Sequence, residues 1–205
     1  MSTVIIGTGI ANVGSVVNMF RRLGDNPVVS GDPDTIATAD KLLLPGVGAF
    51  DAGMAGLHSS GLAEALRLRA REGVPILGIC LGMQLLFNSS EEGVAAGLGL
   101  IPGVVRRLPA DSPVGPVRIP HMGWSRLKHC RPHGLTEGIG EEARFYFVHS
   151  YAVVPNDDDD IIGVSTHGSR FVSAVARENV FGVQFHPEKS HRYGKALLGN
   201  FLRGF

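Results

Sequence analysis

The chain has 205 residues, enough to bury a full hydrophobic core in one domain or two small ones. Its 19 basic and 19 acidic side chains give a formal net charge of +0, which argues against nucleic acid or an anionic membrane as the main partner. No apolar run is long enough to span a membrane and residues 1–10 lack the pattern of a secretory signal, so we expect a cytoplasmic protein with free cysteines.

The first ninety residues alternate between strand and helix patterns. Strands are predicted at Val4–Ile6, Pro27–Val29, Lys41–Leu44 and Ile76–Ile79. Helices are predicted from Asn12 as N-cap to Gly24, around Met54–Ser59, over Leu62–Glu72 and from Leu81 to Phe87. This alternation indicates a parallel sheet with right-handed crossovers.

A glycine-rich loop follows the first strand, and it suggests two interpretations. A dinucleotide-binding turn would use Asp32, after the second strand, to hold a ribose. However, glycines at positions 7, 9 and 14 do not give the spacing G-x-G-x-x-G. We therefore favour a plain tight turn and predict no cofactor.

The second half is rich in β patterns. Glycine and proline are dense between Gly93 and Pro120, and we expect hairpins on the sheet edge there. Strands are predicted at Val104–Arg107, Val117–Ile119, Phe145–Val148, Ile161–Ser165, Phe171–Ala176 and Val180–Phe185, and a last helix at Gly194–Phe205. The whole pattern predicts a single α/β domain over residues 1–205. It resembles flavodoxin in having an open, mostly parallel central sheet, helices on both faces and added antiparallel hairpins.

Two polar clusters invite a metal interpretation, which we do not favour. His129 and His133 are separated by Pro132, which breaks the helix that would align them, and no second ligand pair is evident. The run Asp157–Asp160 lacks the alternation of a calcium loop and is expected to be a solvated turn.

Cys80 falls on the corner between a predicted strand and a predicted helix. Gly78 and Gly82 bracket it as the glycines of G-x-S-x-G bracket a hydrolase serine. At such an elbow the thiol lies at a helix N-terminus, which favours the thiolate, and the Leu81 N–H faces a developing oxyanion. An inert core cysteine is an equal alternative from this motif alone.

His186-Pro-Glu188 supplies what a thiol nucleophile needs. Pro187 keeps His186 extended, so the imidazole and the Glu188 carboxylate lie on the same side of the chain. The carboxylate can then fix the tautomer of the base. Together with the Cys80 elbow, this predicts a set of nucleophile, base and orienting group.

The segments 78–84 (Gly-Ile-Cys-Leu-Gly-Met-Gln) and 182–188 (Gly-Val-Gln-Phe-His-Pro-Glu) resemble the two signatures of class I (triad) glutamine amidotransferases. Pro45-Gly-Val-Gly48, Pro120-His-Met-Gly-Trp124 and Phe147-Val-His-Ser-Tyr151 narrow the resemblance to the glutaminase subunits of imidazole glycerol phosphate synthase, in histidine biosynthesis. The similarity runs from about Val4 to about Phe201.

The resemblance implies a role for each matching residue. Cys80 attacks the side-chain amide of glutamine, His186 protonates the departing ammonia and then activates water against the thioester, and Glu188 orients His186. The oxyanion is held by the N–H of Leu81 and by that of Val47 or Gly48. The residues expected to line the glutamine pocket are Gly46, Gln84, Glu92, His149, Ser150 and Tyr151.

The resemblance also implies a partner, a separate (β/α)8-barrel cyclase that forms a heterodimer with the glutaminase. This cyclase uses the ammonia to make imidazole glycerol phosphate and AICAR. His121, Met122 and Trp124 are expected at the interface. Water would protonate free ammonia, so delivery requires a dry passage. We hypothesise that partner occupancy controls a peptide flip in segment 46–48 that supplies an oxyanion donor.

Two alternatives stay open on the residues alone. The chain could feed anthranilate or carbamoyl phosphate synthesis, although Pro120–Trp124 speaks against it. It could also be a non-catalytic flavodoxin-like module in which Cys80 is structural. One departure concerns the first turn, where many relatives carry Asp-Tyr-Gly and this chain has Gly7-Thr8-Gly9.

Overall fold

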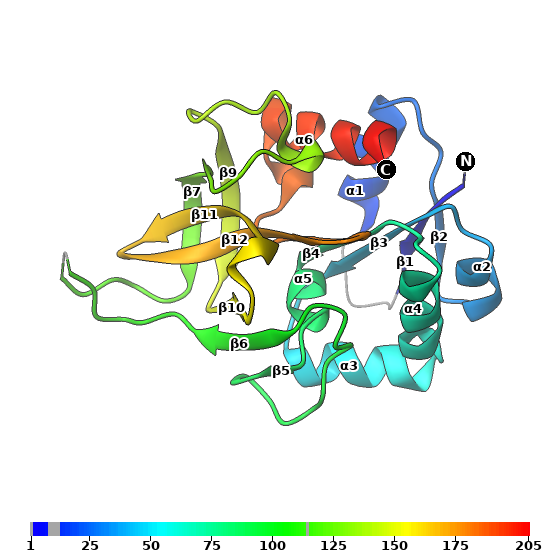
Figure 1. Cartoon of the computed structure of the whole chain (residues 1–205), viewed down its shortest axis with the longest axis horizontal. Helices are drawn as coiled ribbons and strands as arrows, with labels where there is room; N and C mark the ends of the chain where they lie inside the picture. The colour runs from blue at the N-terminus through cyan, green and yellow to red at the C-terminus, as the bar shows by residue number, and fades with distance from the viewer. Residues whose placement is uncertain (1, 8–12, 114) are drawn as a thin grey trace.

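The structure is a computed structural model that describes residues 2–7, 13–113 and 115–205. Its centre is an eight-stranded sheet in the order β2-β1-β3-β4-β13-β12-β11-β8 (Figure 1). The strands of this sheet are β1 (Thr3–Ile6), β2 (Val28–Ser30), β3 (Lys41–Gly46), β4 (Ile76–Cys80), β8 (Lys128–His129), β11 (Ile161–His167), β12 (Ser169–Arg177) and β13 (Val180–Val183). All pairs from β2 to β13 are parallel, and β12, β11 and β8 extend the sheet in antiparallel fashion.

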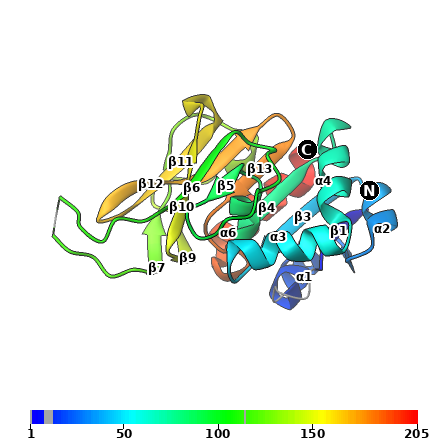
Figure 2. The same ribbon diagram turned by 90° about the horizontal axis from the view of Figure 1, so that it is seen from below.

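Helices cover both faces of this sheet, as the sequence predicts. They are α1 (Val13–Arg22), α2 (Pro33–Ala37), α3 (Phe50–Ser59), α4 (Leu62–Arg71), α5 (Leu81–Leu85) and α6 (His191–Gly204), with short 3-10 turns η1 (Gly134–Thr136), η2 (Asp158–Asp160) and η3 (Pro187–Lys189). In Figure 1, α1 and α6 lie above the sheet and α3 lies below it; Figure 2, seen from below, places α3 in front. None of the described helices is long and apolar enough to cross a membrane.

Side-chain alternation along the strands divides the core between the two faces. Leu43 of β3 belongs to the same core cluster as Phe20 of α1 and Phe201 of α6, whereas its neighbour Leu42 belongs to the cluster that contains Met54 of α3. All of these side chains are fully buried, and each such burial contributes ~1.5–3 kcal/mol relative to exposure. The parallel strands are apolar on both sides because both sides are covered.

The sequence predicts hairpins on the sheet edge between Gly93 and Pro120, but the strand described there, β6 (Gly103–Arg107), joins a separate small sheet. The hairpin that extends the central sheet is β11–β12. One sheet joins β5 (Ser89–Ser90), β6 (Gly103–Arg107) and β10 (Tyr151–Pro155), and the other pairs β7 (His121–Arg126) with β9 (Arg144–His149). The predicted strand at Val117–Ile119 is wrong: these residues form no strand. Pro116 and Pro120 flank them, and proline lacks the N–H that a ladder requires.

Of the glycine loop at 7–12, only Gly7 is among the described residues, and its N–H donates to the Ser30 carbonyl at 2.9 Å; residues 8–12, with Asn12, lie outside them. Gly24 ends α1 at a φ of 88°, with its N–H bonded to the carbonyl of Arg21. Asp32, the acid of the dinucleotide alternative, is the N-cap of the unpredicted helix α2. Its carboxylate accepts from the Asp34 N–H and from the Thr35 hydroxyl. Asp32 therefore has a structural role.

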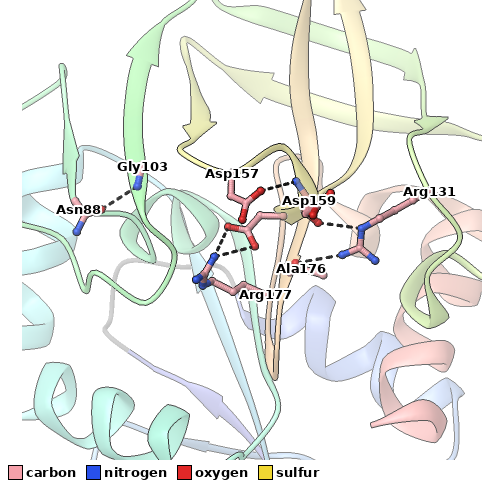
Figure 3. A network of polar contacts seen from close by, with 8 residues as sticks. Asn88, Gly103, Arg131, Asp157, Asp159, Ala176 and Arg177 are labelled. Carbon is pink, nitrogen blue, oxygen red and sulfur yellow. Dashed lines mark hydrogen bonds and ion pairs between the residues drawn. The ribbon is translucent and has the colours of Figure 1, made fainter.

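The acidic run at 157–160 is a turn in which Asp157, Asp158 and Asp159 are exposed, as predicted, whereas Asp160 is buried and anchors the turn to the fold. Figure 3 shows Arg131 and Arg177 on either side of this turn. Arg177 makes an ion pair with Asp160 at 3.0 Å, and Asp160 is 4% exposed. Arg131 Nε donates to the Asp159 carbonyl oxygen at 3.0 Å. The turn thereby ties strands β11 and β12 to the loop before η1.

Candidate active site

Cys80 lies on a strained corner between β4 and α5. Its φ of 56° and ψ of −111° are unusual for any residue with a side chain. The flanking glycines leave the room that this corner needs. A Cβ on Gly78 would lie 2.7 Å from the Gly82 carbonyl oxygen, and one on Gly82 would overlap the Leu44 carbonyl oxygen. The corner therefore requires glycine on both sides of the cysteine.

His186 reaches the same edge of the sheet because β13, which precedes it, runs parallel to β4. The His186 N–H donates to the Tyr146 carbonyl oxygen of β9 at 2.8 Å. Ser190 strengthens this bridge: its hydroxyl donates to the His186 carbonyl at 2.6 Å and accepts from the Tyr146 N–H at 3.0 Å. The backbone of His186 is thus fixed to β9 on one side and to β13 on the other.

The imidazole of His186 is paired with Glu188. Nδ1 of His186 lies 2.8 Å from Oε1 of Glu188, and both side chains are almost fully buried. A carboxylate only accepts, so Nδ1 carries the proton and donates. Nε2 of His186 is buried without a hydrogen-bond partner among the described residues.

Burial lowers the pKa of His186, but the neighbouring Cys80 side chain and the Glu188 carboxylate raise it by more, to about 9. The imidazole therefore carries a proton at neutral pH.

A pocket of about 280 Å³ opens in front of Cys80 and His186. This volume is near the lower end of ligand pockets, ~300 Å³, and suits a ligand of amino-acid size. The pocket is lined by Val47, Gly48, Cys80, Leu81, Gln84, Glu92, Pro120, Val148, His149, Ser150, Tyr151 and His186. Gly46 lies behind it, on a smaller cavity of about 40 Å³ that also touches Glu188.

Two pocket residues are also held in the framework. Nε2 of Gln84 donates to the Tyr151 carbonyl at 3.1 Å and to Oε1 of Gln184 at 3.0 Å. Oε2 of Glu92 accepts from the Phe50 N–H, the first residue of α3, at 2.8 Å. These hydrogen bonds fix the directions of both side chains.

The segment 46–48 packs directly on the Cys80 corner. A Cβ on Gly46 would lie 2.7 Å from the Gly82 nitrogen, so only glycine permits the approach. Gly48 has a φ of 100°, a conformation that favours glycine, and Val47 is 39% exposed beside the pocket. The backbone next to Cys80 therefore includes, at Gly48, a conformation that residues with a side chain avoid.

The three residues expected at a partner interface are divided by the alternation of β7. Met122 is 64% exposed and Trp124 45% exposed, whereas His121 is buried at 3%. Nδ1 of His121 lies 3.0 Å from Nε2 of His149, and its ring stacks on Phe147. His121 therefore belongs to the interior behind the pocket and not to the exposed face.

Trp124 lies opposite Tyr146 in the β7·β9 pair, with its ring edge-on to that tyrosine at 5.8 Å. It also stacks on His191, the first residue of α6, at 5.4 Å. Trp124, on the exposed face of this small sheet, therefore contacts Tyr146, the residue whose backbone holds His186.

The family model for class-I glutamine amidotransferases matches residues 4–205. The chain belongs to this family. Curated relatives of this amidotransferase carry the name imidazole glycerol phosphate synthase subunit HisH. The relative from Moorella thermoacetica is 48% identical, and the match covers 96% of this chain and 92% of the relative. The relative from Pseudomonas aeruginosa is 47% identical, and the match covers 97% of this chain and 98% of the relative. A third, from Methanococcus maripaludis, is 44% identical over 97% and 98%.

Solved structures show the same amidotransferase fold at low sequence identity. The chain aligns with a structure of PurLQS from Thermotoga maritima at a TM-score of 0.76 and 20% identity, covering 99% of this chain and 98% of that one. It aligns with a glutamine amidotransferase from the same organism at 0.72 and 12%, covering 100% and 97%. The predicted fold class is confirmed.

Sequence reasoning missed two groups that touch the Cys80 sulfur. Nε2 of Gln184 lies 3.8 Å from Sγ, and the Val148 carbonyl oxygen lies 3.9 Å from it. The sequence does carry a signal for Gln184, because it is a polar side chain in the apolar run from Val180 to Phe185. No sequence pattern marks the Val148 carbonyl, since backbone contacts depend on the path of β9.

Proposed function

We propose that this amidotransferase is the glutaminase subunit of imidazole glycerol phosphate synthase. It hydrolyses glutamine to glutamate and ammonia, and the ammonia serves a cyclase subunit that makes imidazole glycerol phosphate and AICAR in histidine biosynthesis. The observation that carries this function is a buried Cys80, His186 and Glu188 site in a chain 44–48% identical, over nearly its full length, to relatives with that name.

The chemistry proceeds in two halves through Cys80. The thiolate attacks the carbonyl carbon of the glutamine side chain, and the C=O electron pair moves to oxygen. As this tetrahedral intermediate collapses, His186 gives its proton to the amide nitrogen, and ammonia leaves a thioester behind. Water, deprotonated by the now neutral His186, then attacks the thioester, and glutamate departs as the thiol is restored.

The pKa of His186 suits both halves. The Cys80 thiol is among the groups that raise it to about 9. Once the sulfur is acylated it carries no charge, so the imidazolium loses one of its stabilising neighbours and releases its proton more readily to the departing amine. Glu188 keeps the ring oriented through Nδ1 in both protonation states.

The oxyanion is stabilised by the N–H of Leu81, together with an N–H of Val47 or Gly48. The proposal is supported by the place of these residues on the pocket and by the contact of Gly46 with the Cys80 corner. We attribute control of hydrolysis to a peptide flip in segment 46–48 that follows partner occupancy. The flip hypothesis is wrong if the isolated chain hydrolyses glutamine as fast as the complex.

We place the partner, a (β/α)8-barrel cyclase forming a heterodimer in the cytoplasm, on the exposed face of β7 and β9. Met122 and Trp124 are large apolar side chains exposed there, and exposed apolar patches mark interaction sites. Pro120, just before β7, and Val148 of β9 also line the pocket. A partner on this face would cover the route from Cys80, which keeps ammonia away from bulk water.

The test compares two nitrogen sources in the complex with the cyclase. Cys80→Ala should abolish synthesis from glutamine and leave synthesis from ammonium salts intact. Loss of both activities would mean that Cys80 holds the fold or the interface. A glutamine-analogue electrophile should label Cys80 and leave the exposed Cys130 unmodified. Activity with an anthranilate or carbamoyl phosphate partner, and none with the cyclase, would favour the alternative acceptors.

A further inference from the structure

Gln184 is a fully buried polar side chain in contact with the nucleophile. It lies between the last residue of β13 and His186, and its backbone N–H donates to the Ser173 carbonyl at 2.9 Å. Its side-chain Nε2 lies 3.8 Å from Sγ of Cys80. The proposed chemistry assigns it no part.

The direction of the Gln184 amide follows from its neighbours. Nε2 of Gln84 lies 3.1 Å from the Tyr151 carbonyl oxygen, which only accepts, so this end of the Gln84 amide must be the NH₂ group. The Gln184 atom next to the same NH₂, at 3.0 Å, must then be its oxygen. The NH₂ group of Gln184 therefore faces the Cys80 sulfur.

The Tyr151 carbonyl is itself held by His149, whose Nδ1 donates to it at 2.8 Å. Burial lowers the pKa of His149 to about 3 and that of His121 to about 4, so both rings are neutral and carry one N–H each. Nε2 of His149 then accepts from Nδ1 of His121 at 3.0 Å, and Nε2 of His121 accepts from the Ser125 hydroxyl at 3.0 Å. In each hydrogen bond of this chain, from the Tyr151 carbonyl through His149 and His121 to Ser125, the donor and the acceptor are therefore determined.

We propose that Gln184 is a catalytic residue that donates a hydrogen bond to the Cys80 thiolate, with its amide orientation fixed by Gln84. The Val148 carbonyl, 3.9 Å from the sulfur, accepts from the thiol S–H. Ionisation removes that contact, whereas the Gln184 N–H then meets a full negative charge, and such charge-assisted bonds are about twice as strong. The bond that the Gln184 N–H makes to the thiolate is thus stronger than the bond that the thiol S–H makes to the Val148 carbonyl, and this difference favours the thiolate form of Cys80.

This inference rests on the proposed function, in which Cys80 is the nucleophile, and it predicts a property of the sulfur that can be measured without glutamine. In a Cys130→Ser background Cys80 is the only cysteine. The rate of its alkylation by iodoacetamide, followed by mass spectrometry from pH 5 to pH 10, reports the thiolate fraction.

Gln184→Met keeps the length of the side chain and removes the donor. We expect the pH midpoint of Cys80 alkylation to rise by about one to two units, the effect of losing a hydrogen bond to a charged group. Gln184→Glu should raise it further, since its carboxylate lies near the sulfur, and Gln84→Met should raise it less. Ser173→Ala, a buried neighbour away from Cys80, is the control and should leave the midpoint unchanged.

Circular dichroism establishes that each variant is folded, and Gln84→Met provides the test if substitution at 184 prevents folding. If folded Gln184→Met leaves the pH midpoint of Cys80 alkylation unchanged, the proposal is overturned. If Gln184→Met does not fold, an unchanged midpoint in Gln84→Met overturns it. Failure of the proposed function gives a different result: the Cys130→Ser protein would not support glutamine-dependent synthesis with the cyclase, whatever the alkylation profile.

Discussion

Glu188→Gln tests how the base is tuned. The rise in the pKa of His186 from 6.5 to about 9 corresponds to ~3 kcal/mol in favour of the imidazolium. Burial opposes this rise, so the Cys80 thiol and the Glu188 carboxylate supply all of it. Replacing the carboxylate by a neutral amide keeps an acceptor 2.8 Å from Nδ1 but removes its charge. A hydrogen bond to a charged group is worth ~1.5–3 kcal/mol, so we expect the pKa of His186 to fall by about one to two units.

The assay combines an NMR titration of the His186 imidazole, assigned with a His186→Gln variant, with glutamine turnover in the cyclase complex. Turnover should fall by about tenfold to a hundredfold, less than for Cys80→Ala, because an orienting group contributes less than the nucleophile. Ammonia-dependent synthesis serves as the control and should be unaffected. If Glu188→Gln kept both the pKa near 9 and full turnover, the tuning role assigned to Glu188 would be refuted.

Three further predictions concern the framework. Gly82→Ala should lower the free energy of unfolding, measured in urea, by ~3 kcal/mol or more, because the added Cβ would overlap the Leu44 carbonyl. Gly204→Ala is the control: its Cβ would meet open space, so the same free energy should change by less than ~0.5 kcal/mol. His121 and His149 are neutral when folded and titrate at 6.5 when unfolded, so their contribution to stability is present above pH 6.5 and is lost as pH falls through about 4 and about 3. His121→Gln keeps a donor and an acceptor without titrating, and its unfolding free energy should fall less steeply below pH 6.5; parallel curves would count against the buried neutral pair. Arg144 lies directly opposite Arg126 in the β7·β9 pair, so Arg144→Glu should stabilise the isolated chain by ~0.2–1 kcal/mol and change its rate of association with the cyclase. The same change at the exposed Arg71 of α4 should leave that rate unchanged.

The sequence predicts the part of the site that depends on the parallel sheet. Ile76 to Cys80 is a continuous apolar run, typical of a strand buried on both faces, and the glycines around Cys80 mark the corner that follows. Because parallel strands end at one edge, the two motifs around Cys80 and His186 are expected to meet there, and they do.

Elements that depend on neighbouring segments are harder to predict. Val117–Ile119 has β-forming residues but lies between two prolines, so propensity alone is misleading. The motif Pro120–Trp124 groups His121 with Met122 and Trp124 as one exposed set, although residues of a strand alternate between its faces. Applying that alternation to β7 places His121 inside, next to His149.

The bridge between Tyr146 and His186 has a mechanical consequence. Cys80 is attached to the central sheet through β4, whereas His186 is also attached to the two-stranded β7·β9 sheet. The separation of the His186 imidazole and the Cys80 sulfur therefore depends on the angle between the β7·β9 sheet and the central sheet, as well as on the register of β13 with β4. Trp124, directly opposite Tyr146 in the smaller sheet, lies next to the bridge that joins the two.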